Sequence, residues 1–173
     1  VDGVKLYSAS QWSVYVAGPT NTALSLKRGA FAMLRGRPNM AERMVIEITE
    51  TAGLEDREAC CRFVSTLRDL GCEIALDDFG AGYTSFRHLK QLAVNKVKID
   101  GSFVRKIGEN PENLVFLRTL IELARTFGLE TVADCVETEE EADLLLNEGI
   151  QYMQGYDFGK PDLTAPWTAI GSQ

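Results

Sequence analysis

The sequence has a single histidine and no cysteine pair at metal-ligand spacing. His88 has no second histidine or cysteine near it, so we expect it to have a surface or packing role. This scarcity argues against a Ser-His-Asp triad and against a metal site built on histidine. Any metal ion would be held mainly by carboxylates, which favours Mg²⁺, Mn²⁺ or Ca²⁺.

Long apolar runs and a signal peptide are also missing. No apolar run approaches the roughly 18 residues of a membrane span, and no charged and apolar leader is visible. None of the four cysteines belongs to a C-x-x-C pair, which predicts buried thiols in a reducing compartment; they are Cys60, Cys61, Cys72 and Cys135. We expect a cytoplasmic protein, and because the chain starts at Val1 we expect it to be part of a longer one.

An excess of positive charge is absent as well. The 173 residues include 18 Lys and Arg against 25 Asp and Glu, which gives a formal net charge of -7. This balance is not the electrostatic footprint of a nucleic-acid or membrane-surface binder, so we expect neither partner. A local positive site could still hold a small phosphorylated ligand. The length suits one domain.

The sequence does contain an alternation of short apolar runs and longer segments of helical period. The apolar runs are 12–18, 44–51, 73–80, 96–103, 130–137 and 150–158. Helices are predicted over 56–70, 110–127 and 138–149, and each ends at or just before a glycine. Asn110 and Pro111 supply an N-cap and a first-turn proline, and Thr138 with Glu141 forms a capping box.

Repeated strand–helix units limit the fold to two classes. Apolar runs with little alternation are typical of parallel strands covered by helices, which build either a doubly wound sheet or a (β/α) barrel. No Gly-x-Gly-x-x-Gly motif follows a strand and no Walker loop is present, which weakens the doubly wound nucleotide-binding alternative.

Polar residues stand at the C-terminal end of nearly every predicted strand. They are Glu47 and Glu50, Asp77 and Asp78, Lys98 and Asp100, Asp134 and Glu137, and Gln154. In a (β/α) barrel this is the face where active sites are built. Helix N-capping explains any one of these acids equally well, but a run of five strands favours a shared site. Lys98 inside a strand is costly unless paired, so it is a functional candidate, with a structural ion pair as the alternative.

Several motifs, in order, resemble the EAL-domain cyclic di-GMP phosphodiesterases. They read E-I-T-E at 47–50, D-D-F-G-A-G-Y at 77–83, K-I-D at 98–100 with S-F-V at 102–104, V-E-T at 136–138, and Q-G-Y at 154–156 followed by K-P at 160–161. The resemblance implies an α/β fold, a TIM-like (β/α) barrel, with about six βα units and an incomplete N-terminal side. We expect the barrel domain at 12–162, between a segment without assigned structure (1–11) and a C-terminal tail (163–173).

The resemblance also implies two divalent metals that activate a water against one phosphodiester of cyclic di-GMP. By position, the metal ligands would be Glu47, Asp77, Asp78 and Asp134, with Asp77 bridging both ions. Lys98 would hold or deprotonate the water, and Glu137 would steady the loop after strand 73–80. The ligand-binding set would include Asp100, Gln154 and Pro161. The regulatory loop, linked in the family to dimerisation, would include Phe79, Gly80, Ala81, Gly82 and Tyr83.

Three departures from the family pattern affect the metal ligands. No Glu-Ala-Leu motif occurs in the chain, V-Y-V-A-G at 14–18 places Tyr15 where the family has a metal-binding asparagine, and Asp134 replaces a glutamate. A shorter carboxylate disturbs a site that needs sub-ångström placement. We therefore expect weak or absent Mg²⁺ or Mn²⁺ occupancy, confined to Asp77 and Asp78 with help from Glu47.

These observations favour an impaired EAL-type domain that acts as a cyclic di-GMP-binding or dimerising signalling module. An active metal-dependent phosphodiesterase that yields the linear dinucleotide is one alternative, and a protein-interaction module without nucleotide is another. A barrel two strands short exposes strand edges, for which residues 4–7 are the only extra strand candidate. We expect the partner to be a second copy or an upstream domain of the same protein.

Overall fold

The computed structural model describes residues 5–6, 12–16, 34–49, 57–81 and 86–160. Within them a single parallel sheet of seven strands has the order β1-β7-β6-β5-β4-β3-β2. The strands are β1 (Lys5–Leu6), β2 (Trp12–Val16), β3 (Met44–Thr49), β4 (Glu73–Phe79), β5 (Lys96–Ile99), β6 (Glu130–Ala133) and β7 (Tyr152–Met153). Consecutive strands from β2 to β7 are neighbours, as in a (β/α) barrel.

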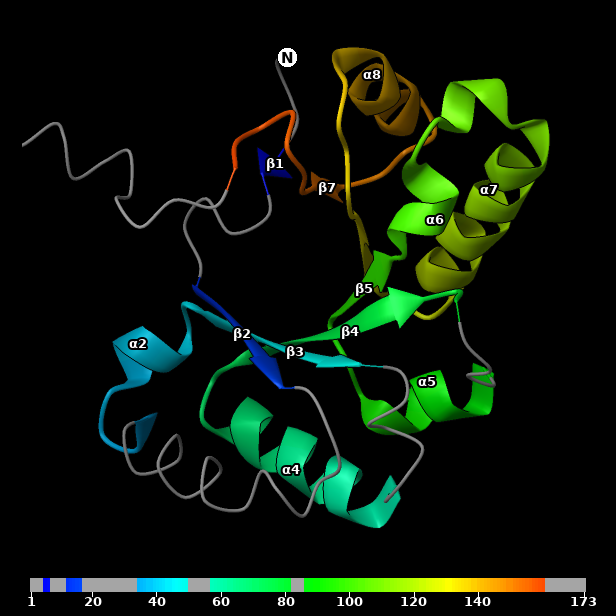
Figure 1. Ribbon diagram of the computed structural model, residues 1–173. Helices are drawn as coiled ribbons and strands as arrows, with labels where there is room; N and C mark the ends of the chain where they lie inside the picture. Colours follow the sequence, from blue (N-terminus) through cyan, green and yellow to red (C-terminus); the bar gives the residue numbers. More distant parts are fainter. Residues whose placement is uncertain (1–4, 7–11, 17–33, 50–56, 82–85, 161–173) are drawn as a thin grey trace, which may run out of the picture.

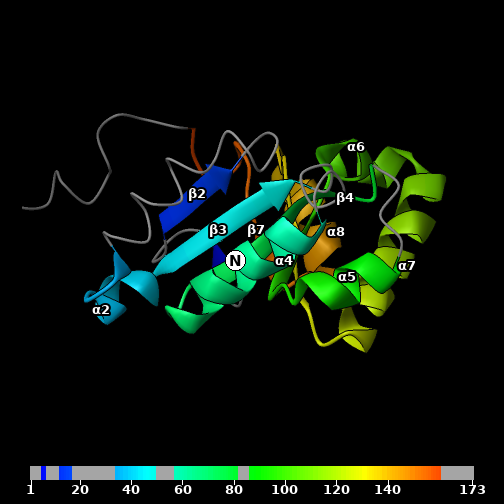
Figure 2. The same cartoon turned by 90° about the horizontal axis from the view of Figure 1, so that it is seen from below.

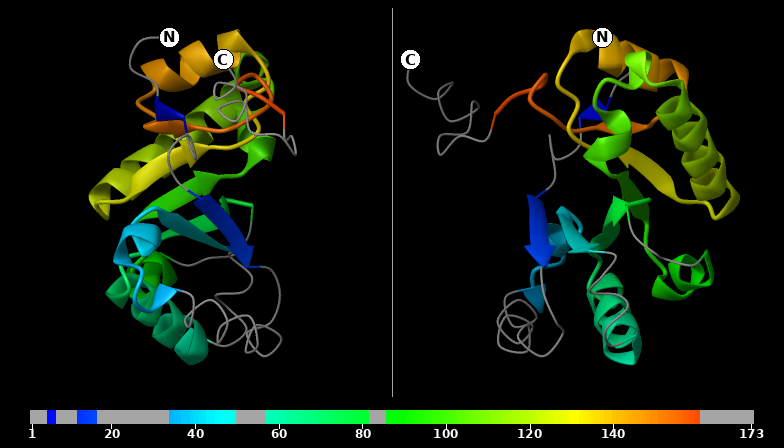
Figure 3. Two further views of the ribbon diagram at one scale, coloured as in Figure 1. Left: turned by 90° about the vertical axis from the view of Figure 1, so that its left-hand side faces the viewer. Right: turned by 45° about the vertical axis from the view of Figure 1, so that its right-hand side comes forward.

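Helices follow the strands and cover one side of the sheet. They are α2 (Pro38–Ala41), α4 (Arg57–Asp69), α5 (Phe86–Leu92), α6 (Gly101–Val104), η1 (Ile107–Glu109), α7 (Pro111–Thr126) and α8 (Glu139–Asn147). Figures 1 and 3 show the sheet curving from β2 round to β1, with α4, α5, α7 and α8 along its outer side. Seen from below, α4 runs beside β3 and β4 (Figure 2). No helix in the described part of the chain is both long and apolar enough to cross a bilayer.

The three predicted helices are confirmed, together with two of their caps. The Asn110 side chain accepts hydrogen bonds from the N–H groups of Glu112 and Asn113 at the start of α7. The Thr138 hydroxyl accepts from the N–H of Glu141 at the start of α8. Because these bonds satisfy helix N–H groups that have no intrahelical partner, the local sequence alone marks where each helix begins.

The predicted strand over 96–103 is wrong beyond Ile99. The Asp100 carboxylate accepts a hydrogen bond from the Ser102 N–H at 2.9 Å, and this cap starts the short helix α6. The apolar residues Phe103 and Val104 therefore belong to a helix, and an apolar run without clear period does not distinguish the two. The strand predicted over 130–137 likewise ends at Ala133.

The two faces of the sheet differ in character. On the outer face, alternate residues such as Ile46, Ile74 and Val97 pack with the helices into the main core. The inner face carries a small second cluster of Val45, Ala75, Val132 and Tyr152. Because side chains alternate along a strand, the residues two positions further along from this cluster also face inward, and these include Glu47, Asp77 and Asp134.

The four cysteines are free thiols in the structure. Cys60 and Cys72 are buried as predicted, whereas Cys61 and Cys135 are only half-buried. Burial, and after it the charge of Asp134, raises the pKa of the Cys135 thiol, so this thiol stays protonated at neutral pH.

The two ends of the sheet bear on self-association. Residues 5–6, within the extra strand candidate, pair in parallel with Tyr152 and Met153 of β7. At the other end, β2 pairs with β3 and, among the described strands, with no other. A five-residue strand with one open edge is a template for pairing with another chain.

We therefore expect the isolated chain to self-associate at micromolar concentration, as measured by light scattering. A strictly monomeric chain that melts cooperatively would contradict the expectation.

Candidate functional site at the carboxyl end of the sheet

Lys98 lies among three carboxylates, two on strands and one directly after a third strand. Its Nζ is 3.0 Å from Glu47 Oε2, 3.1 Å from Asp77 Oδ1 and 3.7 Å from Asp134 Oδ2. Glu47 is on β3, Asp77 on β4, and Asp134 directly follows β6. Because all strands are parallel, residues at their carboxyl ends meet at one edge, and the structure brings together four of the predicted site residues there.

The charged groups of this cluster are buried, so their interactions with one another are only weakly screened by water. Lys98 is 3% exposed and Glu47 6%. Burial alone would lower the pKa of Lys98, but the charges of Glu47, Asp77 and Asp134 outweigh it and raise the pKa above the ordinary value. Lys98 is therefore an ammonium at neutral pH, a hydrogen-bond donor. Lys98 thus forms the ion pairs that were the alternative explanation for a lysine inside a strand. These ion pairs lie at the sheet edge predicted for the site.

Asp78 lies beside this cluster on an irregular stretch of β4. Its φ is +58°, in the left-handed region, and the pairing of β4 with β5 shifts register between Leu76 and Phe79. Such a bulge re-aims side chains next to functional sites. Partial desolvation of the carboxylate, and after it the charges of Asp77 and Asp100, raise the pKa of Asp78. The Asp78 side chain itself is exposed.

The loop after β6 holds Asp134 through its own backbone. Asp134 Oδ1 accepts a hydrogen bond from the Cys135 N–H at 2.7 Å, which leaves Oδ2 toward Lys98. Cys135 has φ +62°, a conformation that usually requires glycine. A Cβ placed on Gly101 would lie 2.6 Å from Cys135 Sγ, so this loop packs closely on the start of α6.

Asp100 and Glu137 make contacts of a different kind. Asp100 caps α6, as described above, so the helix-capping alternative accounts for this acid. Glu137 Oε1 accepts from Arg105 Nε at 3.1 Å, and its N–H donates to Glu141 Oε2. Both side chains of the Arg105 pair are about half exposed. The structure therefore places Glu137 at the rim of the site, tied to the segment after α6.

The remaining predicted residues are only partly described. Gln154 lies at the rim, where its N–H donates to the Ala133 carbonyl and its carbonyl accepts from the Val136 N–H. Phe79 is buried at 3% exposure, and Gly80 lies against Phe103, Phe116 and Leu120. Ala81 closes a turn onto the Asp78 carbonyl. Three residues lie outside the described part of the chain: Gly82, Tyr83 and Pro161.

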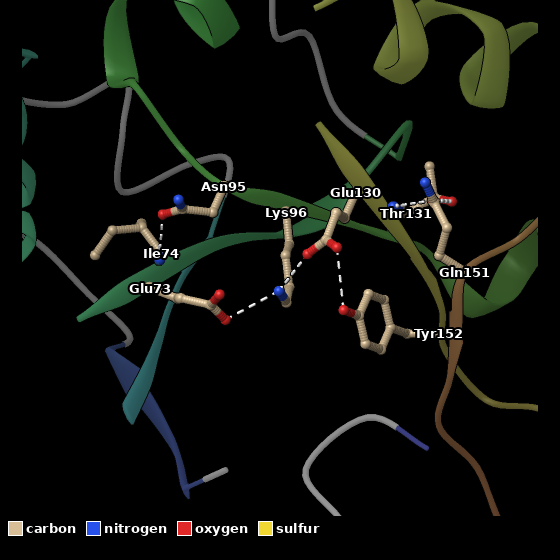
Figure 4. Close-up of polar contacts among 8 residues, drawn as sticks. All are labelled: Glu73, Ile74, Asn95, Lys96, Glu130, Thr131, Gln151 and Tyr152. Carbon is tan, nitrogen blue, oxygen red and sulfur yellow. Dashed lines mark hydrogen bonds and ion pairs between the residues drawn. The ribbon is translucent and has the colours of Figure 1, made fainter. Parts of the chain in front are cut away.

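Sequence reasoning missed a second buried lysine, at the opposite end of the strands. Lys96 is 1% exposed, and its Nζ contacts Glu130 and is 2.9 Å from Glu73 Oε2. It also lies over the Tyr152 ring, whose hydroxyl donates to Glu130 Oε1 (Figure 4). The signal was available, because Lys96 precedes Lys98 by two residues in the same apolar strand and therefore shares its face.

The donor types suit a hard divalent cation, but their arrangement does not. Carboxylate oxygens are the ligands that Mg²⁺, Mn²⁺ and Ca²⁺ prefer. Among the residues that the structure describes, however, no group of three or more His, Cys, Asp and Glu side chains is placed to hold a metal ion. The oxygens of Glu47, Asp77 and Asp134 converge on the Lys98 ammonium instead.

The pairing of β2 with β3 locates Tyr15, the residue predicted to replace a metal-binding asparagine. Tyr15 of β2 is the register partner of Glu47 on β3. Tyr15 therefore lies beside Glu47 on the neighbouring strand.

A parallel strand–helix sheet with charged residues gathered at its carboxyl edge is the arrangement of a (β/α)-barrel-type domain. The EAL domain family model matches residues 28–161. The chain belongs to the EAL domain family.

Named relatives and solved structures agree with this assignment. The chain is 40% identical over 121 residues to the cyclic di-GMP phosphodiesterase PdeB of Shewanella oneidensis. The matched segment covers 70% of this chain but only 14% of PdeB. The EAL domain of Mycobacterium smegmatis DcpA has a TM-score of 0.79 at 32% identity, over 92% of this chain and 72% of that chain. Klebsiella pneumoniae BlrP1, in a complex with manganese and cyclic di-GMP, has a TM-score of 0.73 at 25% identity, over 84% of this chain and 38% of that one.

Proposed function

We propose that this chain is an EAL-type signalling domain that binds cyclic di-GMP and hydrolyses it slowly or not at all. The observation that carries the proposal is the Lys98 ammonium among Glu47, Asp77 and Asp134 at the carboxyl edge of the sheet. In a metal-dependent phosphodiesterase, the metals neutralise the phosphate and generate hydroxide near neutral pH. Here the same carboxylates are engaged by a protein cation.

Four features of the chain support slow hydrolysis. A protonated Lys98 can donate a hydrogen bond to a water or a phosphate oxygen, but it cannot accept a proton from an attacking water. The chain contains no Glu-Ala-Leu motif, and Tyr15 stands at the aligned position of a ligand asparagine. One carboxylate oxygen of Asp134 accepts a hydrogen bond from the Cys135 N–H. Few oxygens are left for two cations.

A protein-interaction role without nucleotide is the second candidate, and the charge of the cluster favours it. Three carboxylates against one ammonium leave an excess of negative charge at the site. A dianionic nucleotide is repelled by such an excess unless cations accompany it or other groups hold its phosphates. Arg105 and Lys106, directly after α6 at this edge, are cations of this chain that could do so.

We predict that the isolated chain, incubated with cyclic di-GMP and Mg²⁺ or Mn²⁺, forms the linear dinucleotide at least about 100-fold more slowly than PdeB assayed alongside. Losing metal-based charge stabilisation costs on the order of 3 kcal/mol of barrier, and each 1.4 kcal/mol is about tenfold. Product is measured by liquid chromatography. Clear metal-dependent turnover that disappears in Asp77→Ala would refute this.

Calorimetry of cyclic di-GMP binding in EDTA separates the two candidates. Heat of binding with a saturable stoichiometry supports the nucleotide-binding module. If the folded chain binds no cyclic di-GMP in either EDTA or Mg²⁺, the result supports the protein-interaction module instead.

A further inference from the structure

A row of charged and polar contacts crosses four neighbouring strands at the amino end of the sheet. The Lys96 ammonium of β5 lies 2.9 Å from Glu73 Oε2 of β4 and also contacts Glu130 Oε2 of β6. Glu130 Oε1 accepts a hydrogen bond from the Tyr152 hydroxyl of β7 at 3.1 Å. Figure 4 shows the four side chains side by side, with Tyr152 at the β7 end. Each contact joins adjacent strands, so the row forms only when all four strands keep their observed offsets.

Lys96 is the buried member of this row. It is 1% exposed, whereas the side chains of Glu73 and Glu130 are 34% and 42% exposed. Burial alone would lower the pKa of Lys96, but its hydrogen bonds to Glu130 and Glu73 outweigh burial and raise the pKa above the ordinary value. A buried ammonium cannot leave its carboxylates without becoming an unpaired charge. Lys96 therefore holds Glu130 at the place where Tyr152 meets it.

A second contact joins β7 to β6 beside the row. Gln151 Oε1 accepts hydrogen bonds from the Thr131 N–H, at 2.7 Å, and from the Thr131 hydroxyl. Thr131 is 1% exposed, so both donors are buried. Leaving buried donors without an acceptor is costly, because they have given up their hydrogen bonds to water. Residues 151 and 152 thus each satisfy polar groups of β6.

The strand that these contacts hold is too short to define its own register. β7 has two residues, Tyr152 and Met153, which pair with Val132 and Ala133 of β6. A slip by one residue would turn Met153 to the inner face, where the small apolar cluster could accept it. Apolar packing therefore discriminates weakly between the two registers, whereas the polar contacts of residues 151 and 152 form only in the observed one.

The register of β7 decides which residue reaches the carboxyl edge of the sheet. Gln154 follows β7 directly. Its N–H donates to the Ala133 carbonyl at 2.9 Å, and its carbonyl accepts from the Val136 N–H at 3.0 Å. A slip by one residue would put Met153 or Gly155 in its place.

The two sets of contacts form one unit, the amino-end network, which consists of Glu73, Lys96, Glu130, Thr131, Gln151 and Tyr152. We propose that the amino-end network sets the register of β7 and thereby places Gln154 at the carboxyl edge. Its members are positioning residues that act through the strand. The inference goes beyond the proposed function, because it concerns the opposite end of the strands and stands whether or not a nucleotide or a metal ion is bound.

The test is amide hydrogen exchange followed by NMR, with cross-strand contacts between β6 and β7 as a direct measure of register. The test variant combines Gln151→Leu with Tyr152→Phe, which removes the polar contacts of β7 and keeps the size of both side chains. We expect the amides of Gln154 and Val136 to exchange at least about tenfold faster than in wild type, while amides inside α7 keep their rates, because a local change of register opens only the strand concerned.

Lys96→Met tests the network from β5, two strands away from β7. It should produce the same selective acceleration at Gln154, because Glu130 loses the cation that holds it. The matched control is Arg62→Met, which breaks an exposed ion pair with Glu58 within α4. This control should match wild type at Gln154 and Val136.

An equal acceleration of all amides would mean that the variants lower global stability without affecting register, and it would overturn the proposal. Unchanged exchange at Gln154 in the folded test variant would overturn it as well. If the double variant does not fold, Gln151→Leu and Tyr152→Phe are measured singly, with the same selective acceleration expected. Wild type decides independently of all variants, because two sets of cross-strand contacts between β6 and β7 in wild type would show that no register is fixed.

Discussion

Replacing Gly155 by alanine is expected to lower the melting temperature by about 10 °C, the largest effect of any single methyl group in the described part of the chain. A Cβ built on Gly155 would lie 2.0 Å from the Val136 carbonyl oxygen and 2.3 Å from the Val136 N. These are backbone atoms, which cannot rotate away as the tip of a side chain can. One of the two backbone segments must therefore move.

The movement would break hydrogen bonds that join the two loops at the rim of the site. Val136 N donates to the Gln154 carbonyl at 3.0 Å, and the Val136 carbonyl accepts from Asp157 N at 3.1 Å. Overpacking with loss of buried hydrogen bonds costs on the order of 3 kcal/mol. For a chain of this length, each kcal/mol is worth about 2–4 °C of melting temperature.

Thermal and urea unfolding followed by circular dichroism measure this effect. Gly108→Ala is the matched control, because the nearest atom to a Cβ there is Leu144 Cδ1 at 3.9 Å, an ordinary contact. We expect Gly108→Ala to change the free energy of unfolding by less than about 0.5 kcal/mol. Equal melting temperatures for Gly155→Ala and wild type would show that the loops slip apart without cost.

The second large effect is a coupling between Gly101 and Cys135. A Cβ on Gly101 would lie 2.6 Å from Cys135 Sγ and 2.7 Å from Cys135 Cβ. Rotation of the thiol relieves the first contact but not the second, since the Cβ position is fixed by the backbone. Gly101→Ala alone is therefore expected to cost about 2 kcal/mol of unfolding free energy.

Cys135→Gly should suppress most of that cost, because it removes both atoms that the new methyl group meets. On its own, Cys135→Gly also removes the backbone strain of a non-glycine residue at φ +62°. Removing this strain stabilises the native state by about 1 kcal/mol. The double variant then closes a cycle with a coupling of about 1.5–2 kcal/mol. Urea unfolding of the four proteins measures it, and additive effects within about 0.5 kcal/mol would refute the packing argument.

Much of the fold follows from local patterns in the sequence. The helices near 56–70, 110–127 and 138–149 were predictable because their caps, first-turn residues and terminal glycines act within one turn of chain. The five central strands were predictable because strands buried on both faces read as short apolar runs. Lys98 and the acids at the strand ends could be selected as candidate site residues, since parallel strands collect their carboxyl ends at one edge.

Other features depend on contacts between distant segments and could not be predicted in the same way. The sequence does not distinguish an acid that caps a helix, as Asp100 does, from one that pairs with a lysine, as Asp77 does. Nor does it show that Lys5–Leu6 pairs with β7, because two residues carry too little pattern to select a partner about 145 positions away.

The sequence by itself determined the family, the repeated strand–helix order and the residues at the candidate site. Only the tertiary structure decided that three of the acids direct their oxygens to Lys98. The same holds for Glu73 and Glu130, which pair with Lys96 at the other end of the strands. The physical reason is that periodicity and capping are local, within a few residues, whereas the partner of a buried charge is set by strand register and sheet curvature. Those are properties of the whole sheet.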